Sequence, residues 1–247
     1  MELLDLFANE LRMFRRATGV VGALGCFLLA SCGTVQQQAV TNTSRTFTTV
    51  VVDAGHGGKD NGAYRRYGPP EKNANLDVAM RLARKLRESN FRVVTTRSTD
   101  VFIPLEERAA IGRAQKNSIF VSVHFNDTRR RGIHGFEVYY HSPAAYPLAQ
   151  RVMNHLLTIR GAVNRGVHHA NFRVLRKAAY PAVLVECGFL SNRTEGSEAA
   201  SGSYRDLLAS KIANAITEER HGSSSYAGRQ RAANVPPTEA GGSTAEP

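Results

Sequence analysis

Residues 47–58 read FTTVVVDAGHGG and join a β-branched run to a glycine-rich loop. β-Branched residues favour strands, and three consecutive valines suit a strand that is covered on both faces. A second apolar run of this kind, AVLVEC, occupies residues 182–187. Strands buried on both faces are typical of parallel sheets flanked by helices. The two runs therefore predict an α/β fold with a mostly parallel twisted sheet and helices on both faces.

Helical and extended periods alternate outward from these two runs. Residues 71–90 and 204–220 place apolar side chains at helical spacing. The other predicted helices are residues 105–116 and 144–160. The predicted strands are residues 47–53, 91–96, 119–124, 136–140, 172–175 and 182–187. This alternation, without an internal repeat, favours a single α/β domain.

The composition excludes two broad classes of protein. The chain has 247 residues, of which 42% are hydrophobic and 21% charged, and this balance excludes disorder along the whole chain and a polytopic membrane protein. Three cysteines are too few for a disulfide scaffold. A net charge of +11 favours an anionic partner, which could be nucleic acid, a membrane surface or an acidic polymer.

The N-terminal region has the pattern of an export signal. A basic stretch at residues 13–16 precedes an apolar run at residues 18–30, which ends in the letters LASC. The run is shorter than the about 20 residues of a membrane-spanning helix. Its ending resembles a bacterial lipobox, which implies cleavage before Cys32 and lipidation of its thiol. The alternative is a buried N-terminal helix that happens to contain a cysteine.

The chain is predicted to divide into four parts. Residues 1–31 form the lipoprotein signal, residues 32–45 a polar tether, residues 46–220 the domain and residues 221–247 a disordered tail rich in Ser, Gly, Ala and Pro. Met13 is an alternative start of the chain, because the segment before it contains acidic residues, which are rare in export signals. Export to the periplasmic face of a membrane argues against nucleic acid and favours an acidic polymer of the cell envelope as the partner.

Metal-binding or acidic side chains stand at the ends of three predicted strands. His56 follows the first strand, and His124 and Glu186 end two later ones. Because the carboxyl ends of parallel strands meet at one edge, these side chains are expected to lie together. Glu71 begins a helix that starts near the same edge. Two imidazoles and one carboxylate are a common set of catalytic zinc ligands, and a further carboxylate can move protons.

Each of these residues also has a simpler interpretation. The loop at residues 55–58 could bind phosphate, although it lacks the Lys-Ser/Thr of a P-loop. Glu71 could be a charge favoured at a helix N-terminus, His124 a core histidine, and Glu186 half of a buried ion pair. Cys187 should point away from Glu186 and serve as a small core residue. The other histidines considered are interpreted as surface residues: His134, His141, His168 and His169.

Taken in order, the motifs of residues 47–220 resemble the zinc-dependent N-acetylmuramoyl-L-alanine amidases (amidase type 3) of bacterial cell-wall turnover. They are VVDAGHGG (51–58), DNGA (60–63), EKNANL (71–76), TR (96–97) with Asp100, Leu105 and Arg108, VSVHFN (121–126), PAVLVE (181–186) and GFLSN (188–192). Ala54 departs from the proline common in the family, but it is not a ligand position.

The resemblance implies a role for each candidate residue. His56, Glu71 and His124 would hold Zn²⁺, and Glu186 would be the catalytic carboxylate. The substrate would be the amide between the lactyl group of N-acetylmuramic acid and L-alanine in peptidoglycan. Residues 136–181 leave no room for the helical insert that blocks the zinc in some members, so the site would be uncovered. A monomer would suffice, with an activator protein as a possible partner.

Further expectations concern the surroundings of the site. Asp53 and Asn126 are candidates for orienting the imidazoles. Arginines in flanking loops could contact the polymer or could form a merely solvated basic face: Arg65, Arg66, Arg129, Arg130 and Arg131. The competing functions are a non-catalytic peptidoglycan-binding lipoprotein and another zinc peptidase or deacetylase of the cell envelope.

Overall fold

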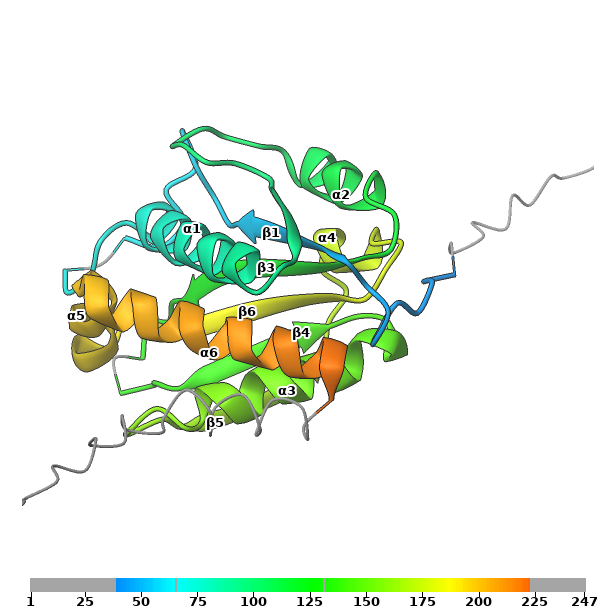
Figure 1. The fold of residues 1–247 in the computed structure, drawn as a ribbon. Helices are drawn as coiled ribbons and strands as arrows, with labels where there is room; N and C mark the ends of the chain where they lie inside the picture. The colour runs from blue at the N-terminus through cyan, green and yellow to red at the C-terminus, as the bar shows by residue number, and fades with distance from the viewer. Residues whose placement is uncertain (1–38, 65, 131, 223–247) are drawn as a thin grey trace, which may run out of the picture. The chain divides into compact units, whose positions relative to one another are not determined.

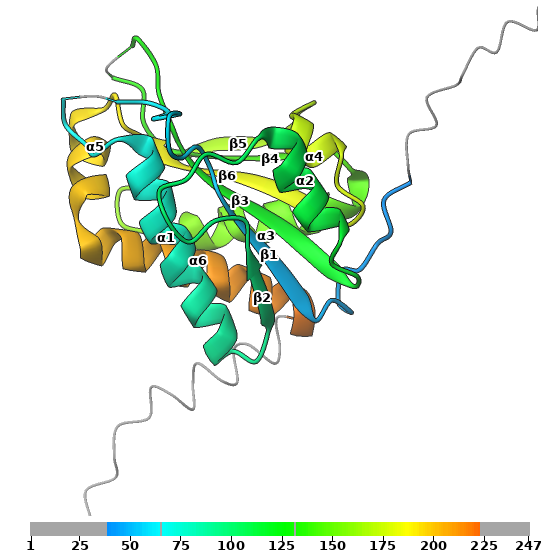
Figure 2. The same ribbon diagram turned by 90° about the horizontal axis from the view of Figure 1, so that it is seen from above.

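The fold is built on a six-stranded sheet (Figure 1). The computed structural model describes residues 39–64, 66–130 and 132–222. The strands are β1 (Thr49–Ala54), β2 (Arg92–Thr95), β3 (Ser118–Asn126), β4 (Phe136–Tyr140), β5 (Asn164–His169) and β6 (Ala182–Phe189). They lie in the sheet in the order β2-β1-β3-β6-β4-β5 (Figure 2). Strand β4 runs antiparallel to β6, and the other neighbours are parallel. The predicted mostly parallel sheet is therefore confirmed.

Helices cover both faces of the sheet, as expected, but unequally (Figure 2). The larger layer contains α1 (Glu71–Glu88), α3 (Tyr146–Leu156) and α6 (Gly202–His221). On the opposite face lie the shorter α2 (Leu105–Arg113) and α4 (Arg173–Arg176). Helix α5 (Arg193–Ala200) and the single 3₁₀ turn Pro143–Ala145 complete the described elements.

The side chains of β3 alternate between a large and a small core. Ile119, Val121 and Val123 pack in the large core, whereas Phe120 packs in the small one with Leu184. Because the small core covers only the first part of the central strands, the polar side chains that follow on the same face reach the carboxyl edge of the sheet. This asymmetry leaves room for a site on the face carrying α2 and α4.

The prediction differs from the structure at three elements: one has the wrong type and two are absent from the prediction. Residues 172–175 are predicted as a short strand, but α4 begins at Arg173 and turns both Val174 and Leu175 toward the sheet. Strand β5 was not predicted, because most of its residues are polar and partly or fully exposed at the edge of the sheet. Helix α5 was also missed; Asn192 accepts hydrogen bonds from the backbone N–H groups of Thr194 and Glu195 and caps it.

The last residues of the predicted tether lie on the domain. Thr41 donates its backbone N–H to the carbonyl of Ala179, and the buried Thr43 hydroxyl donates to the carbonyl of Ser118. The predicted signal, Cys32 and the tail from residue 223 onward lie outside the described residues. None of the described helices has the length and apolar character that a bilayer crossing requires.

Candidate active site

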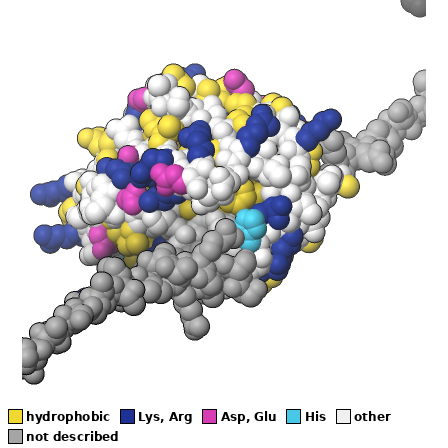
Figure 3. Space-filling view, in the orientation of Figure 1, with side chains coloured by type: hydrophobic (Ala, Val, Ile, Leu, Met, Phe, Trp, Pro, Cys, Tyr) yellow, Lys and Arg dark blue, Asp and Glu magenta, His cyan; other side chains and the backbone are white. Residues whose placement is uncertain are grey.

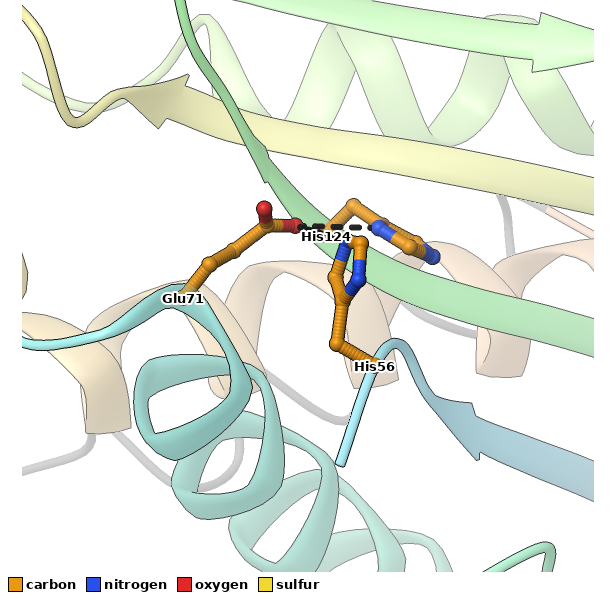
Figure 4. A group of neighbouring side chains, drawn as sticks. All are labelled: His56, Glu71 and His124. Carbon is orange, nitrogen blue, oxygen red and sulfur yellow. Dashed lines mark hydrogen bonds and ion pairs between the residues drawn. The ribbon is translucent and has the colours of Figure 1, made fainter. Parts of the chain in front are cut away.

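Three side chains from separate elements converge at the carboxyl ends of β1 and β3 (Figure 4). His56 lies in the loop after β1, Glu71 is the first residue of α1, and His124 belongs to β3. Nε2 of His56 lies 3.1 Å and Nδ1 of His124 lies 3.0 Å from the same Glu71 oxygen, Oε1. One ligand atom from each residue falls within 4.8 Å of the others. The structure therefore brings together the two imidazoles and one carboxylate that the sequence pattern singled out.

Glu71 is held in place by the backbone around it. Its Oε2 accepts a hydrogen bond of 2.9 Å from the N–H of Ala63, and its Oε1 accepts one of 3.2 Å from the N–H of Phe125. Although burial favours the neutral carboxyl, hydrogen bonds and charge from His124 and His56 hold the pKa of Glu71 well below its usual range. The carboxylate is thus ionised and oriented, as a metal ligand must be.

His56 is oriented by a carboxylate from its own loop. Its Nδ1 lies 2.8 Å from Oδ2 of Asp60, which leaves Nε2 directed at Glu71. Burial opposes the charged imidazole, but Glu71 and Asp60 together raise the pKa of His56 to about 9. A carboxylate bonded to the outer nitrogen fixes the ring of a metal-binding histidine and makes it a more basic ligand.

Asp53 and Asn126, which the sequence suggested for this role, bond elsewhere. Asp53 is fully buried and accepts hydrogen bonds from three side chains, Thr96, Arg108 and Ser122. Asn126 donates its side-chain amide to Glu137. These groups tie strands and α2 together, and the expectation that they orient the imidazoles is wrong. The sequence signal for the actual partner was the carboxylate of the DNGA motif, four residues after His56.

Glu186 lies beside His124, because the two residues are register partners in β6 and β3. Its Oε2 is buried without a hydrogen-bond partner among the described residues. Burial raises the pKa of Glu186 to about 7; the positive charge of His124 opposes this shift, and the negative charges of Glu71 and Glu137 add to it. A carboxyl group with this pKa can both accept and donate a proton near neutral pH. Its neighbour Cys187 packs in the large core, as predicted.

A cavity of about 510 Å³ connects these groups with the face that carries α2 and α4. His56, His124 and Glu186 line it from the sheet side. The imidazoles remain accessible, with side-chain exposures of 24% for His56 and 19% for His124. This volume lies in the usual range for sites that bind small molecules. The cavity and the exposed ligands agree with an uncovered site.

Gly55 gives a direct test of how tightly the ligands are packed. A Cβ atom at this position would lie 2.2 Å from Nε2 of His124, so Gly55→Ala must displace the imidazole. We expect the affinity of this candidate site for a divalent metal ion to fall by about 10–100-fold, as metal affinity does when groups that orient ligands are changed. Isothermal titration calorimetry would measure it. Gly132→Ala is the matched control, because a Cβ atom there would meet nothing within 4 Å; equal affinities in the two variants would contradict this packing.

Comparisons with known proteins agree with the fold and identify the family. The family described as N-acetylmuramoyl-L-alanine amidase matches residues 50–218. Among curated proteins, the uncharacterized protein YqiI of Bacillus subtilis is 36% identical over 172 residues, covering 68% of this chain and 82% of YqiI. The amidase LytC of the same organism is 34% identical over 168 residues, covering 66% of this chain and 34% of LytC.

Solved structures of amidases also match this chain. The amidase AmiC2 of Nostoc punctiforme matches with a TM-score of 0.67 and 38% identity, over 69% of this chain and 95% of AmiC2. The family match spans β1 to α6 and so includes all the strand ends at which the candidate residues stand. The chain therefore belongs to the N-acetylmuramoyl-L-alanine amidase family and is an amidase of this class.

Proposed function

We propose that this amidase depends on zinc and hydrolyses the bond between the lactyl group of N-acetylmuramic acid and L-alanine of the peptidoglycan stem peptide. The observation that carries the proposal is the convergence of His56 and His124 on one oxygen of Glu71. Glu186 lines the same cavity as both imidazoles. The family match supports the choice of substrate bond.

The donor set fits zinc. Two imidazole nitrogens and one carboxylate oxygen within 4.8 Å are ligands that catalytic zinc sites use, with one position left open. Oε2 of Glu186, which has no hydrogen-bond partner within residues 39–64, 66–130 and 132–222, fits a carboxylate that bonds to water or substrate. When bound by His56, Glu71 and His124, zinc would polarise the amide carbonyl and lower the pKa of water at the site.

Glu186 is proposed to carry the proton between water and the leaving group. An amine leaves poorly unless it is protonated, so one group must remove a proton from the attacking water and deliver it to the alanine nitrogen. A pKa of about 7 allows Glu186 to perform both steps. Asp60 meanwhile keeps Nε2 of His56 directed toward Glu71 through the bond to its Nδ1.

The identity of the newly formed amine tests the proposal. A soluble muramoyl peptide is incubated with the protein, and new amines are labelled with an amine-reactive dye and identified. The proposed reaction frees the α-amine of L-alanine. Labelling of another stem residue would instead show a peptidase, and labelling of the sugar would show a deacetylase. No new amine from zinc-loaded, folded protein would support a binding lipoprotein.

We also propose that the protein is exported and lipid-anchored at Cys32, facing the periplasm. The lipobox-like letters LASC at residues 29–32 support this, although they lie outside the described residues. Relatives such as the probable cell wall amidase LytH of Staphylococcus epidermidis, 31% identical over 172 residues, support a location in the cell envelope. Catalysis needs only one copy of the chain, because the described copy supplies all four proposed site residues.

An activator protein is a second proposed partner. The CwlD amidase of Clostridioides difficile was solved in complex with the GerS lipoprotein, and it matches this chain with a TM-score of 0.65 and 26% identity. That likeness supports a search for a protein partner of this chain. Peptidoglycan remains the proposed substrate, and no role with nucleic acid is proposed.

Basic side chains should contribute to polymer binding. Figure 3 shows Lys and Arg side chains distributed over one face of the molecule, and Arg66, Arg129 and Arg130 lie in loops. Because salt screens exposed charges, we expect binding to purified peptidoglycan to weaken as salt rises from about 0.05 to 0.5 M. Sedimentation with the polymer would measure this. Arg129→Gln combined with Arg130→Gln should make binding less dependent on salt. If binding by the unmodified protein does not change with salt, the basic side chains do not contact the polymer and are merely solvated.

A further inference from the structure

Large apolar side chains that reach solvent gather at the cavity containing Glu186. Phe102 is 40%, Leu105 55% and Phe172 42% exposed, and all three line this cavity. Single exposed apolar residues are common on protein surfaces, but a cluster around a cavity indicates a binding surface. The catalytic mechanism uses none of these side chains, so they need another explanation.

The two phenylalanines approach the site from opposite sides. Phe102 lies against the loop after β1, where a Cβ atom on Gly58 would be 2.6 Å from the Phe102 nitrogen. The ring of Phe172 lies 5.1 Å from the ring of Tyr139 in β4. Strands β3 and β6 lie between β1 and β4 in the sheet. The two rings therefore bracket the strands that carry His124 and the catalytic carboxylate.

The cavity between the two rings has apolar walls as well. Val174 and Leu184 are 5% and 6% exposed and line it, with Ile103 on the side of Phe102. Apolar walls favour the burial of hydrocarbon groups, because burial removes their surface from water. A substrate in this cavity would thus bind best if it presents small apolar groups on both sides of the bond near Glu186.

The proposed substrate has this chemistry. Its scissile amide is flanked by two methyl groups, one on the lactyl carbon and one on L-alanine. We propose that Phe102 and Phe172 are specificity-determining residues that each contact one of these two methyl-bearing groups. This inference rests on the proposed function, which names the amide but does not assign the residues that recognise its surroundings.

Substrates that lack one methyl group test the inference. Three soluble muramoyl peptides are compared: the natural form, a form with glycine in place of L-alanine, and a form with a glycolyl in place of the lactyl group. In the unmodified protein, removal of either methyl should lower kcat/KM by about tenfold or more, the usual effect of one methyl-sized group in an apolar pocket. Phe102→Ala and Phe172→Ala should each abolish the preference for a different methyl and raise KM more than they lower kcat.

Matched variants separate recognition from folding. Phe102→Leu and Phe172→Leu keep an apolar side chain and should keep most of each preference. Leu207→Ala removes a side chain that is 38% exposed on α6 and should leave both preferences unchanged. If the unmodified protein cleaves the natural substrate and both alanine variants keep its full methyl preferences, this inference alone is wrong. If the unmodified protein cleaves none of the three, the proposed function fails and the inference fails with it.

Discussion

Glu186→Gln should lower kcat by about 10²–10⁴-fold, the usual contribution of a positioned general acid or base. Glutamine keeps the shape of the side chain but cannot accept the proton that the mechanism assigns to this carboxylate. Because Glu186 is not a proposed metal ligand, the bound zinc and KM should change little. Rates on a soluble muramoyl peptide, together with metal analysis of the same samples, would measure both effects.

A control variant shows whether the fall in kcat is specific to Glu186. Glu107 is exposed on α2, so Glu107→Gln removes one carboxylate away from the site and should keep the full rate. If the Glu186→Gln variant retained the normal kcat, Glu186 would not be the group that transfers the proton. Loss of zinc together with activity would instead make Glu186 part of the metal site.

His56→Asn should strongly reduce both the zinc content and the rate. The backbone of His56 has a φ of 58°, and asparagine tolerates this left-handed conformation better than most residues. The substitution therefore removes the proposed ligand with little strain in the loop. Changing groups that only orient ligands costs about 10–100-fold in metal affinity, so loss of a ligand should cost at least as much. Metal analysis after dialysis against a weak chelator would measure the remaining zinc.

His134→Asn is the matched control for this experiment. His134 is exposed in the loop before β4, and its Nδ1 lies 3.0 Å from the carbonyl oxygen of Gly132. This variant should keep one zinc per chain and the full rate. If His56→Asn bound zinc as tightly as the control, His56 would not be a ligand, whatever its distance from Glu71.

The buried part of the fold could be predicted because its strands have a continuous apolar sequence. Strands β1, β3 and β6 lie inside the sheet with neighbours on both sides, so the valine-rich runs identify them. Edge strand β5 has little apolar surface to bury, and Gly166 at its centre has a φ of 113°. Its pairing with β4 depends on distant parts of the chain, which a local pattern does not record.

The candidate ligands could be predicted from topology, but their supporting contacts could not. His56, His124 and Glu186 stand at or near strand ends, and parallel strands bring such ends together. Asp60 reaches His56 only because the loop folds back on itself, with reciprocal backbone hydrogen bonds between Gly57 and Asp60. The side chains on either side of the cavity, such as Phe172, likewise come together only through the order of strands in the sheet.

Release of stem peptides during zinc titration tests the central claim most directly. Metal-free protein is titrated with zinc in the presence of purified peptidoglycan, and the soluble products are identified by mass. If the proposed His56, Glu71 and His124 site is correct, whole stem peptides beginning with L-alanine should appear in proportion to added zinc, up to one zinc per chain. Equal release by the metal-free protein, or products that are only shortened stem peptides, would contradict a zinc amidase.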